Sequence, residues 1–167
     1  LAKTGGAVAV SSKLIIGTVG ASYGSATVQL AGASQIATTA TVTMYAQSFL
    51  DLNGYNANLG VLNGAPGGTI FNNSTGTTTT LTVGTGDTTG QHLGSIVDNT
   101  SGTGSVALTK TGTGAFVLGG YNTYTRATLV QAGALQVGLT GMGTTGTGAV
   151  TVQSGATVLG TGVIQGS

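Results

Sequence analysis

The sequence has few or no residues of several types. The low number of charged residues is the most informative shortage, because it argues against whole classes of binding partner. The 167 residues include no tryptophan, one proline and one histidine, and only 4% of them are charged. An average domain has about 25% charged residues. Binding to DNA, RNA or an anionic membrane needs clustered lysine and arginine side chains. The four basic residues here are scattered and the net charge is only +1, so such binding is not expected. We predict no nucleic-acid partner.

Two further absences concern the cellular setting. Cysteine is absent, which suits an exported protein but suits many cytosolic proteins equally well. No run of about 18 apolar residues occurs, so we expect no transmembrane helix and no membrane insertion. The chain begins with Leu1 rather than methionine, from which we expect a processed or truncated product whose signal peptide has been removed.

What is abundant is glycine, threonine and β-branched apolar residues. The chain has 32 glycines, and 40% of its residues are hydrophobic, which is enough to build a core. Threonine, valine and isoleucine favour strands, while glycine and asparagine tolerate the positive φ angles of tight corners. The glycines have no strict three-residue period, so collagen is excluded.

The segment 106–138 shows the pattern most clearly, with four apolar groups of three residues separated by Gly, Thr and Asn. No group has a helical period or the length of a helix, so each predicts a short strand closed by a turn. The groups are 106–108, 116–118, 128–130 and 135–137.

Similar apolar groups recur along the whole chain, without a linker or charge run. Asn53-Gly54 and Asn63-Gly64 are expected to form tight turns ten residues apart, and 72–78 and 84–91 are expected to be loops. We predict one domain over residues 1–167, a β-solenoid of roughly seven or eight coils about 35 Å long. A β-sandwich is the structural alternative, although it would have fewer and longer strands.

Residues 106–138 resemble the passenger-associated transport repeat of bacterial autotransporters. The resemblance is firm over about a fifth of the chain and departs at Arg126, where the family usually has glycine. It implies an all-β, right-handed parallel β-helix, exported to the bacterial surface, whose repeats are scaffold without a catalytic motif. The matching positions are Leu108, Thr109, Lys110, Gly112, Gly114, Leu118, Gly120, Asn122, Thr123, Tyr124, Thr125, Thr128, Val130, Gly133, Leu135 and Gly138.

These repeat positions are expected to build corners. Gly112 and Gly114 fit one tight corner, and Asn122 with Thr123 fits the next, where their side chains would bond backbone groups. Tyr124 is expected to cover that corner, and asparagines of successive coils to stack in a ladder. Lys110 is expected to be a solvated, outward side chain, and Arg126 to re-route its corner, because arginine adopts positive φ only at a cost.

Residues capable of chemistry are few. Asp87, His92 and Asp98 fall within twelve residues, but we interpret them as solvated loop residues, and Asp51 as a turn or cap residue. One histidine and two aspartates make a thin ligand set. The Gly141-x-Gly143-x-x-Gly146 fingerprint lacks a following helix and an acidic partner. We therefore predict no catalytic residue, no cofactor and no metal site, and the protein is not expected to be an enzyme.

Three hypotheses of function follow, in order of preference. The first is an extracellular structural or adhesive protein, either a subunit that stacks end to end into a homo-oligomeric filament or part of a longer passenger stalk. The second is a module that binds ice through Thr-x-Thr rows or surface glycans through a tyrosine patch. The third is a polysaccharide-acting enzyme. The tyrosines are Tyr23, Tyr45, Tyr55, Tyr121 and Tyr124.

Overall fold

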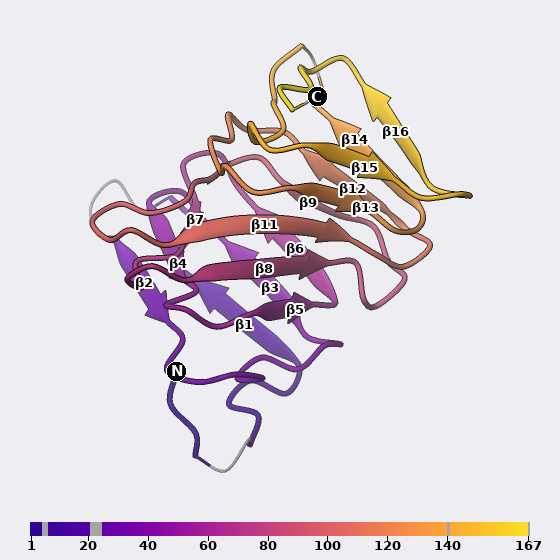
Figure 1. Ribbon diagram of the computed structural model, residues 1–167. Helices are drawn as coiled ribbons and strands as arrows, with labels where there is room; N and C mark the ends of the chain where they lie inside the picture. Colours follow the sequence, from indigo (N-terminus) through magenta and orange to yellow (C-terminus); the bar gives the residue numbers. More distant parts are fainter. Residues whose placement is uncertain (5–6, 21–24, 140, 167) are drawn as a thin grey trace.

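The chain folds into a parallel β-solenoid, seen in a computed structural model that describes residues 1–4, 7–20, 25–139 and 141–166. In Figure 1 its strands lie one above another as stacked coils, with the N-terminus at one end and the C-terminus at the other. All sixteen strands among the described residues pair in parallel, and these residues contain no helix. The predicted all-β parallel solenoid is confirmed.

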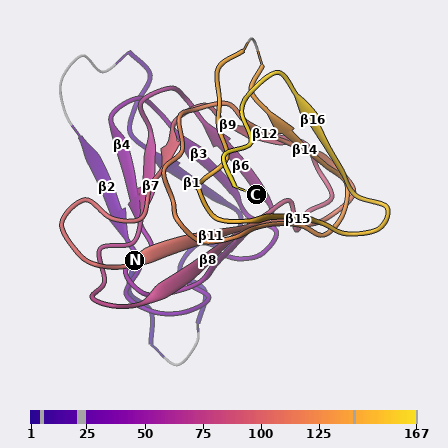
Figure 2. The same ribbon diagram turned by 45° about the horizontal axis from the view of Figure 1, so that its top comes forward.

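Three sheets form the three sides of each coil (Figure 2). The seven-stranded sheet consists of β1 (Lys13–Ile16), β3 (Thr41–Met44), β6 (Val61–Gly64), β9 (Gly90–His92), β12 (Ala115–Leu118), β14 (Ala134–Val137) and β16 (Thr157–Gly160). The four-stranded sheet consists of β2 (Ala26–Gln29), β4 (Ser48–Asp51), β7 (Thr69–Phe71) and β10 (Ser95–Ile96). The five-stranded sheet consists of β5 (Ala57–Leu59), β8 (Thr78–Val83), β11 (Ser105–Lys110), β13 (Thr128–Val130) and β15 (Val150–Val152).

The solenoid makes about six turns, fewer than the seven or eight predicted. The register of the seven-stranded sheet places Asn63 beside Gln91, 28 residues later, whereas Ala115 lies beside Ala134 after only 19. The longer coils contain loops between β7 and β8, β8 and β9, and β10 and β11, and these loops take up residues without adding a turn. At about 4.8 Å per coil, six turns span about 29 Å.

The four strands predicted within 106–138 are confirmed as β11, β12, β13 and β14. Near the N-terminus, Val10 forms a single parallel bridge with Ile36. None of the described residues forms a helix that is long and apolar enough to cross a membrane.

The core is a set of apolar columns, because parallel pairing in register stacks equivalent side chains from coil to coil. In one column Leu81 pairs with Leu108, and both are fully buried. In another, Phe116 pairs with Gly90, where a Cβ atom would lie 2.8 Å from the Leu62 carbonyl oxygen of the preceding coil. Glycine at this position thus allows the two backbones to approach closely.

Truncating a core column should destabilise the protein strongly. We expect Leu108→Ala to lower the free energy of unfolding by roughly 2–5 kcal/mol, because the rigid ladders on either side limit collapse around the cavity. Chemical denaturation followed by circular dichroism measures this change. Thr109→Ala, on the outward face of the same strand, is the control and should shift the free energy by only about 0.5 kcal/mol. Equal effects of the two substitutions would contradict the assigned register.

Candidate functional site

The chemistry-bearing side chains of this chain lie mainly at the corners between sheets. At the corner after the four-stranded sheet, Asn122 is fully buried and joins three coils. Its Oδ1 accepts a hydrogen bond from the Ile96 amide at 2.7 Å, and its Nδ2 donates to the Thr144 carbonyl at 2.7 Å. The partners of Asn122 above and below are Ile96 and Thr144, so the expected ladder of stacked asparagines does not form at this position.

The carboxylates at the corners accept backbone amides from neighbouring segments. Asp51 Oδ1 accepts from Asn53 at 2.8 Å and from Asn73, in the next coil, at 3.1 Å. Asp98 Oδ1 accepts from the Val106 amide at 2.9 Å and the Thr125 amide at 3.0 Å. These bonds use the carboxylates as acceptors that join each corner to neighbouring segments of the chain.

Asp87 likewise accepts a backbone amide from a neighbouring coil, at a different corner. Its Oδ1 accepts the Thr113 amide of the next coil at 2.8 Å, and Asp87 itself adopts a positive φ of 56°. The interpretation of Asp87 and Asp98 as merely solvated loop residues was therefore incomplete, because each carboxylate binds the coil that follows. Among the described residues, no three His, Cys, Asp or Glu side chains come together in a group that could hold a metal ion.

His92 was expected in a loop and instead lies fully buried in β9. It occupies an inner column between Gly64 and Leu118, with Nε2 3.3 Å from the Ser95 carbonyl and Nδ1 without a hydrogen-bond partner. Desolvation lowers the pKa of the imidazole to about 4, partly opposed by the bond to Ser95. The histidine is therefore neutral at pH 7.

Lys110 was expected to be solvated, and the structure corrects this prediction. Its side chain is fully buried, with Nζ donating to the carbonyl oxygens of Thr111, Gly112 and Ala132 at 2.5, 2.9 and 3.2 Å. Burial lowers the pKa of the ammonium, and the charge of Asp87 partly opposes that shift. Lys110 thereby uses its three donors to clamp the corner of its own coil to the corner of the next.

The strand alternation contained a signal for Lys110 that the sequence analysis missed. Val106, Leu108 and Lys110 occupy alternate positions of β11, and all three are buried, while Ala107 and Thr109 are partly exposed. A period of two places the lysine on the inner face with the two apolar residues. Its charge suggested the opposite orientation, but the corner carbonyls supply the partners that burial requires.

The two Asn-Gly pairs differ. Asn53 and Gly54 have φ angles of 46° and 84°, the left-handed geometry of a tight turn, and Asn53 Nδ2 donates to the Leu30 carbonyl. Asn63 and Gly64 end strand β6 instead, and the predicted turn there is wrong. Gly64 is needed for space, because a Cβ atom would lie 1.8 Å from His92 Nδ1.

The remaining glycines of the repeat serve two purposes. Gly112 and Gly133 take positive φ angles of 69° and 65°. Gly114 does not, and its hydrogen faces the Thr88 carbonyl, which a Cβ atom would approach to 2.4 Å. Close backbone approach, rather than a special angle, therefore explains glycine at Gly114.

Tyr124 lies inside the core rather than over the corner as expected. It is fully buried, its hydroxyl is 2.6 Å from Thr128 Oγ1, and burial raises the pKa of the phenol. Thr123 is exposed and donates its amide to the Ile96 carbonyl. Arg126 avoids the strain of a positive φ angle, and its Nε donates to Ser105 Oγ at 2.9 Å.

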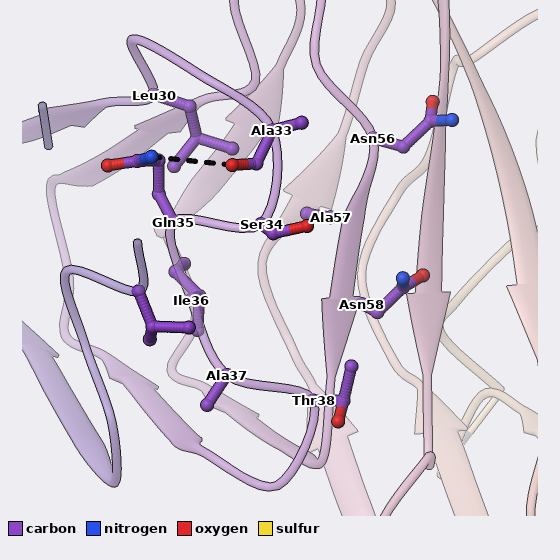
Figure 3. A pocket seen from close by; sticks show the side chains of 11 residues that line it. Leu30, Ala33, Ser34, Gln35, Ile36, Ala37, Thr38, Asn56, Ala57 and Asn58 are labelled. Carbon is purple, nitrogen blue, oxygen red and sulfur yellow. Dashed lines mark hydrogen bonds between the residues drawn. The ribbon is translucent and has the colours of Figure 1, made fainter. Parts of the chain in front are cut away.

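The tyrosines do not form one patch in the part of the chain that the structure describes. Tyr124 is buried, Tyr45 and Tyr55 are half-buried, and Tyr121 is 64% exposed, while Tyr23 lies outside the described residues. Tyr121 borders a shallow apolar pocket of about 540 Å³ with Met142 and Val163. A second pocket, of about 450 Å³, lies beside β5 and is shown in Figure 3.

Replacing Lys110 should loosen two corners at once. Lys110→Met keeps the stem but removes the three donors, so buried carbonyl oxygens lose their partners, and we expect a loss of roughly 2–4 kcal/mol in the free energy of unfolding. Denaturation in urea measures it. The matched control Lys13→Met removes an exposed lysine and should change the free energy by about 0.5 kcal/mol or less. Indistinguishable midpoints for the two variants would contradict the clamp.

His92 should make stability depend on pH. Its folded pKa of about 4 lies below the model value of 6.5, so the unfolded chain binds the proton more strongly. The contribution of His92 to the free energy of unfolding is therefore fully present above pH 6.5 and decreases as the pH drops towards 4. Below pH 4 the loss levels off at about 3 kcal/mol. Denaturation from pH 7.5 to 4 measures the slope, and His92→Leu should remove that component. If the free energy of unfolding depends on pH equally steeply in His92→Leu, His92 is not the group responsible.

Comparison with known families gives one result, which falls on the segment that contains Lys110 and Asn122. The Passenger-associated-transport-repeat family matches residues 108–137. Neither the curated proteins nor the solved structures include a significant match to the chain. The matched residues run from β11 to β14 and span more than one coil of the solenoid, because β11 and β13 are neighbours in one sheet and β12 and β14 are neighbours in another. They include Lys110 and Asn122 of the two corner networks. The chain therefore carries a passenger-associated transport repeat within a parallel β-solenoid, as expected of a repeat from a bacterial autotransporter passenger.

Proposed function

We propose that this protein is a structural scaffold of the bacterial surface, a solenoid that serves as the stalk of an exported passenger or as the subunit of a filament. The observation that carries the proposal is the matched repeat, whose strands β11 to β14 lie within a stack of parallel coils. The family is associated with autotransporter passengers, which are secreted to the cell surface, so an extracellular location follows from this proposal.

The use of the polar groups supports a scaffold rather than an enzyme. Asp51, Asp87 and Asp98 all accept backbone amides, Lys110 is engaged by three carbonyls, and His92 is buried and neutral. Catalysis needs a group that can reach substrate and change its protonation state there. Because these side chains are committed to holding coils together, we propose that the protein has no enzymatic activity of its own.

The final coil has the chemistry for stacking against another coil. Val130 is fully buried beneath Val152 in the register of the five-stranded sheet, whereas Val152 itself is 44% exposed. The strands β15 and β16 each have a neighbour on one side only among the described residues. A further coil, from the same chain or from a second copy, would cover these side chains and pair with these edges. We favour the end-to-end filament.

The binding alternatives have weaker support. Thr82 pairs with Thr109, but the next residue in that column is Leu129, so the column of threonines on the five-stranded sheet is interrupted. The column that contains Thr80 continues with Ala107. An ice-binding face needs repeated Thr-x-Thr rows, which these columns do not maintain. Of the four tyrosines that the structure describes, only Tyr121 is exposed, which leaves a glycan-binding patch without support from the other three.

Electron microscopy with fibre diffraction of the purified protein tests the filament. We expect filaments with an axial spacing of about 4.8 Å, since parallel coils would continue across the junction. Val152→Lys places a charge in an inner column of the end face and should abolish them. Thr151→Lys, whose side chain points outward from the same strand, should leave them intact. Dispersed short rods for the unmodified protein would overturn the filament and leave the stalk.

A further inference from the structure

The five-stranded sheet has a break below its first strand. β5 pairs with β8 on one side only, although the preceding coil continues beneath it as residues 33–38. That lower segment pairs instead with the coil below, through the bridge between Val10 and Ile36. Figure 3 shows the lower segment and β5 running beside one another with the pocket between them. Elsewhere in this sheet the successive strands from β5 to β15 are hydrogen-bonded to each other.

The upper wall of this groove has free backbone groups at Asn58. The Leu59 carbonyl accepts the Gly84 amide, which shows that Leu59 faces β8. Along a strand, successive residues direct their amide and carbonyl to opposite neighbours. The amide and carbonyl of Asn58 therefore point away from β8 and into the groove. Among the described residues, neither group has a hydrogen-bond partner.

The lower wall presents the same groups at Ile36. The amide of Val10 donates to the Gln35 carbonyl at 2.9 Å, and the Val10 carbonyl accepts from Ala37 at 2.8 Å. These two bonds use the residues on either side of Ile36. Its own amide and carbonyl consequently face upwards, towards β5, and they too are without a partner in the described part of the chain.

The groove is a wedge with one closed end. At Gly60 the two coils touch, because a Cβ atom there would lie 2.8 Å from the Thr39 carbonyl carbon, and Thr85 Oγ1 also donates to the Thr38 carbonyl. Towards Ser34 and Asn56 the walls separate around a volume of about 450 Å³. Leu30 and Ile36, both almost fully buried, form the apolar base of the groove, and none of the described residues that line it is charged.

We propose that this groove binds an extended segment of another polypeptide, which adds as a short parallel or antiparallel strand between Ile36 and Asn58. Two walls that each present an unpaired amide and carbonyl are complementary to a peptide backbone, whose donors and acceptors alternate to both sides. The side chain directed inward meets Leu30 and Ile36, so the segment carries an uncharged apolar residue at alternate positions. The wedge admits about three or four residues at the β rise of roughly 3.3 Å.

Nuclear magnetic resonance of the whole chain tests this proposal with a defined probe, the capped tetrapeptide acetyl-Thr-Val-Thr-Val-amide. Without peptide, the amides of Ile36 and Asn58 should exchange with solvent much faster than the amide of Leu59. Titration to about 10 mM, chosen for a dissociation constant in the millimolar range, should shift both amide signals and slow their exchange about tenfold. The same peptide with methylated backbone nitrogens lacks the donors and should leave both signals unchanged.

Two variants separate the groove from non-specific association. Ala33→Trp fills the exposed mouth of the groove and should abolish the peptide-induced shifts, while Ala46→Trp, at an exposed turn elsewhere, should retain them. Both substitutions lie on the surface, so a native amide spectrum in each establishes that the fold is intact. The proposal fails if the Ile36 and Asn58 amides are already as protected as Leu59, if both peptides act alike, or if neither shifts these signals.

Discussion

The in-register parallel ladder between successive coils is the constraint on which this structure depends. It fixes neighbouring backbones about 4.8 Å apart and places equivalent side chains directly above one another. A large side chain is then accommodated only if the residue above or below it yields space. Gly64 does so for His92, because a Cβ atom at Gly64 would lie 1.8 Å from the imidazole Nδ1.

The same ladder determines how polar groups enter the interior. At each corner the backbone leaves the ladder, and its amides and carbonyls need other partners. Asn122 and Asp98 satisfy amides and carbonyls of adjacent segments, and Lys110 satisfies three carbonyls across two coils. Polar side chains of the types that occur in catalytic sites here form hydrogen bonds between adjacent coils. This use explains how a chain with so few charged residues retains several of them in buried or half-buried positions.

The exception to the ladder is as informative as the rule. Between Ile36 and β5 the coils separate, and backbone groups on both walls lack the partners that successive strands from β5 to β15 provide for each other. The break gives the scaffold an internal surface complementary to a foreign backbone, in addition to the open edges of β15 and β16. The proposed stalk or filament needs only the ladder, whereas peptide capture needs the break, so the two roles depend on different parts of the molecule.

The sequence by itself determined the class of fold, because short β-branched groups separated by glycine and asparagine allow no helix and recur at the spacing of a coil. It also placed the repeat at 106–138, where the family match covers 108–137, and it located the turn at Asn53-Gly54. The orientation of Lys110, the burial of His92 and the role of Gly64 were decided only by the tertiary structure. Each depends on which residue lies in the adjacent coil, 20 to 28 positions away, and that register varies with loop length. The local sequence pattern does not reveal this register between coils. The number of turns and the groove beneath β5 were therefore visible only in the folded structure.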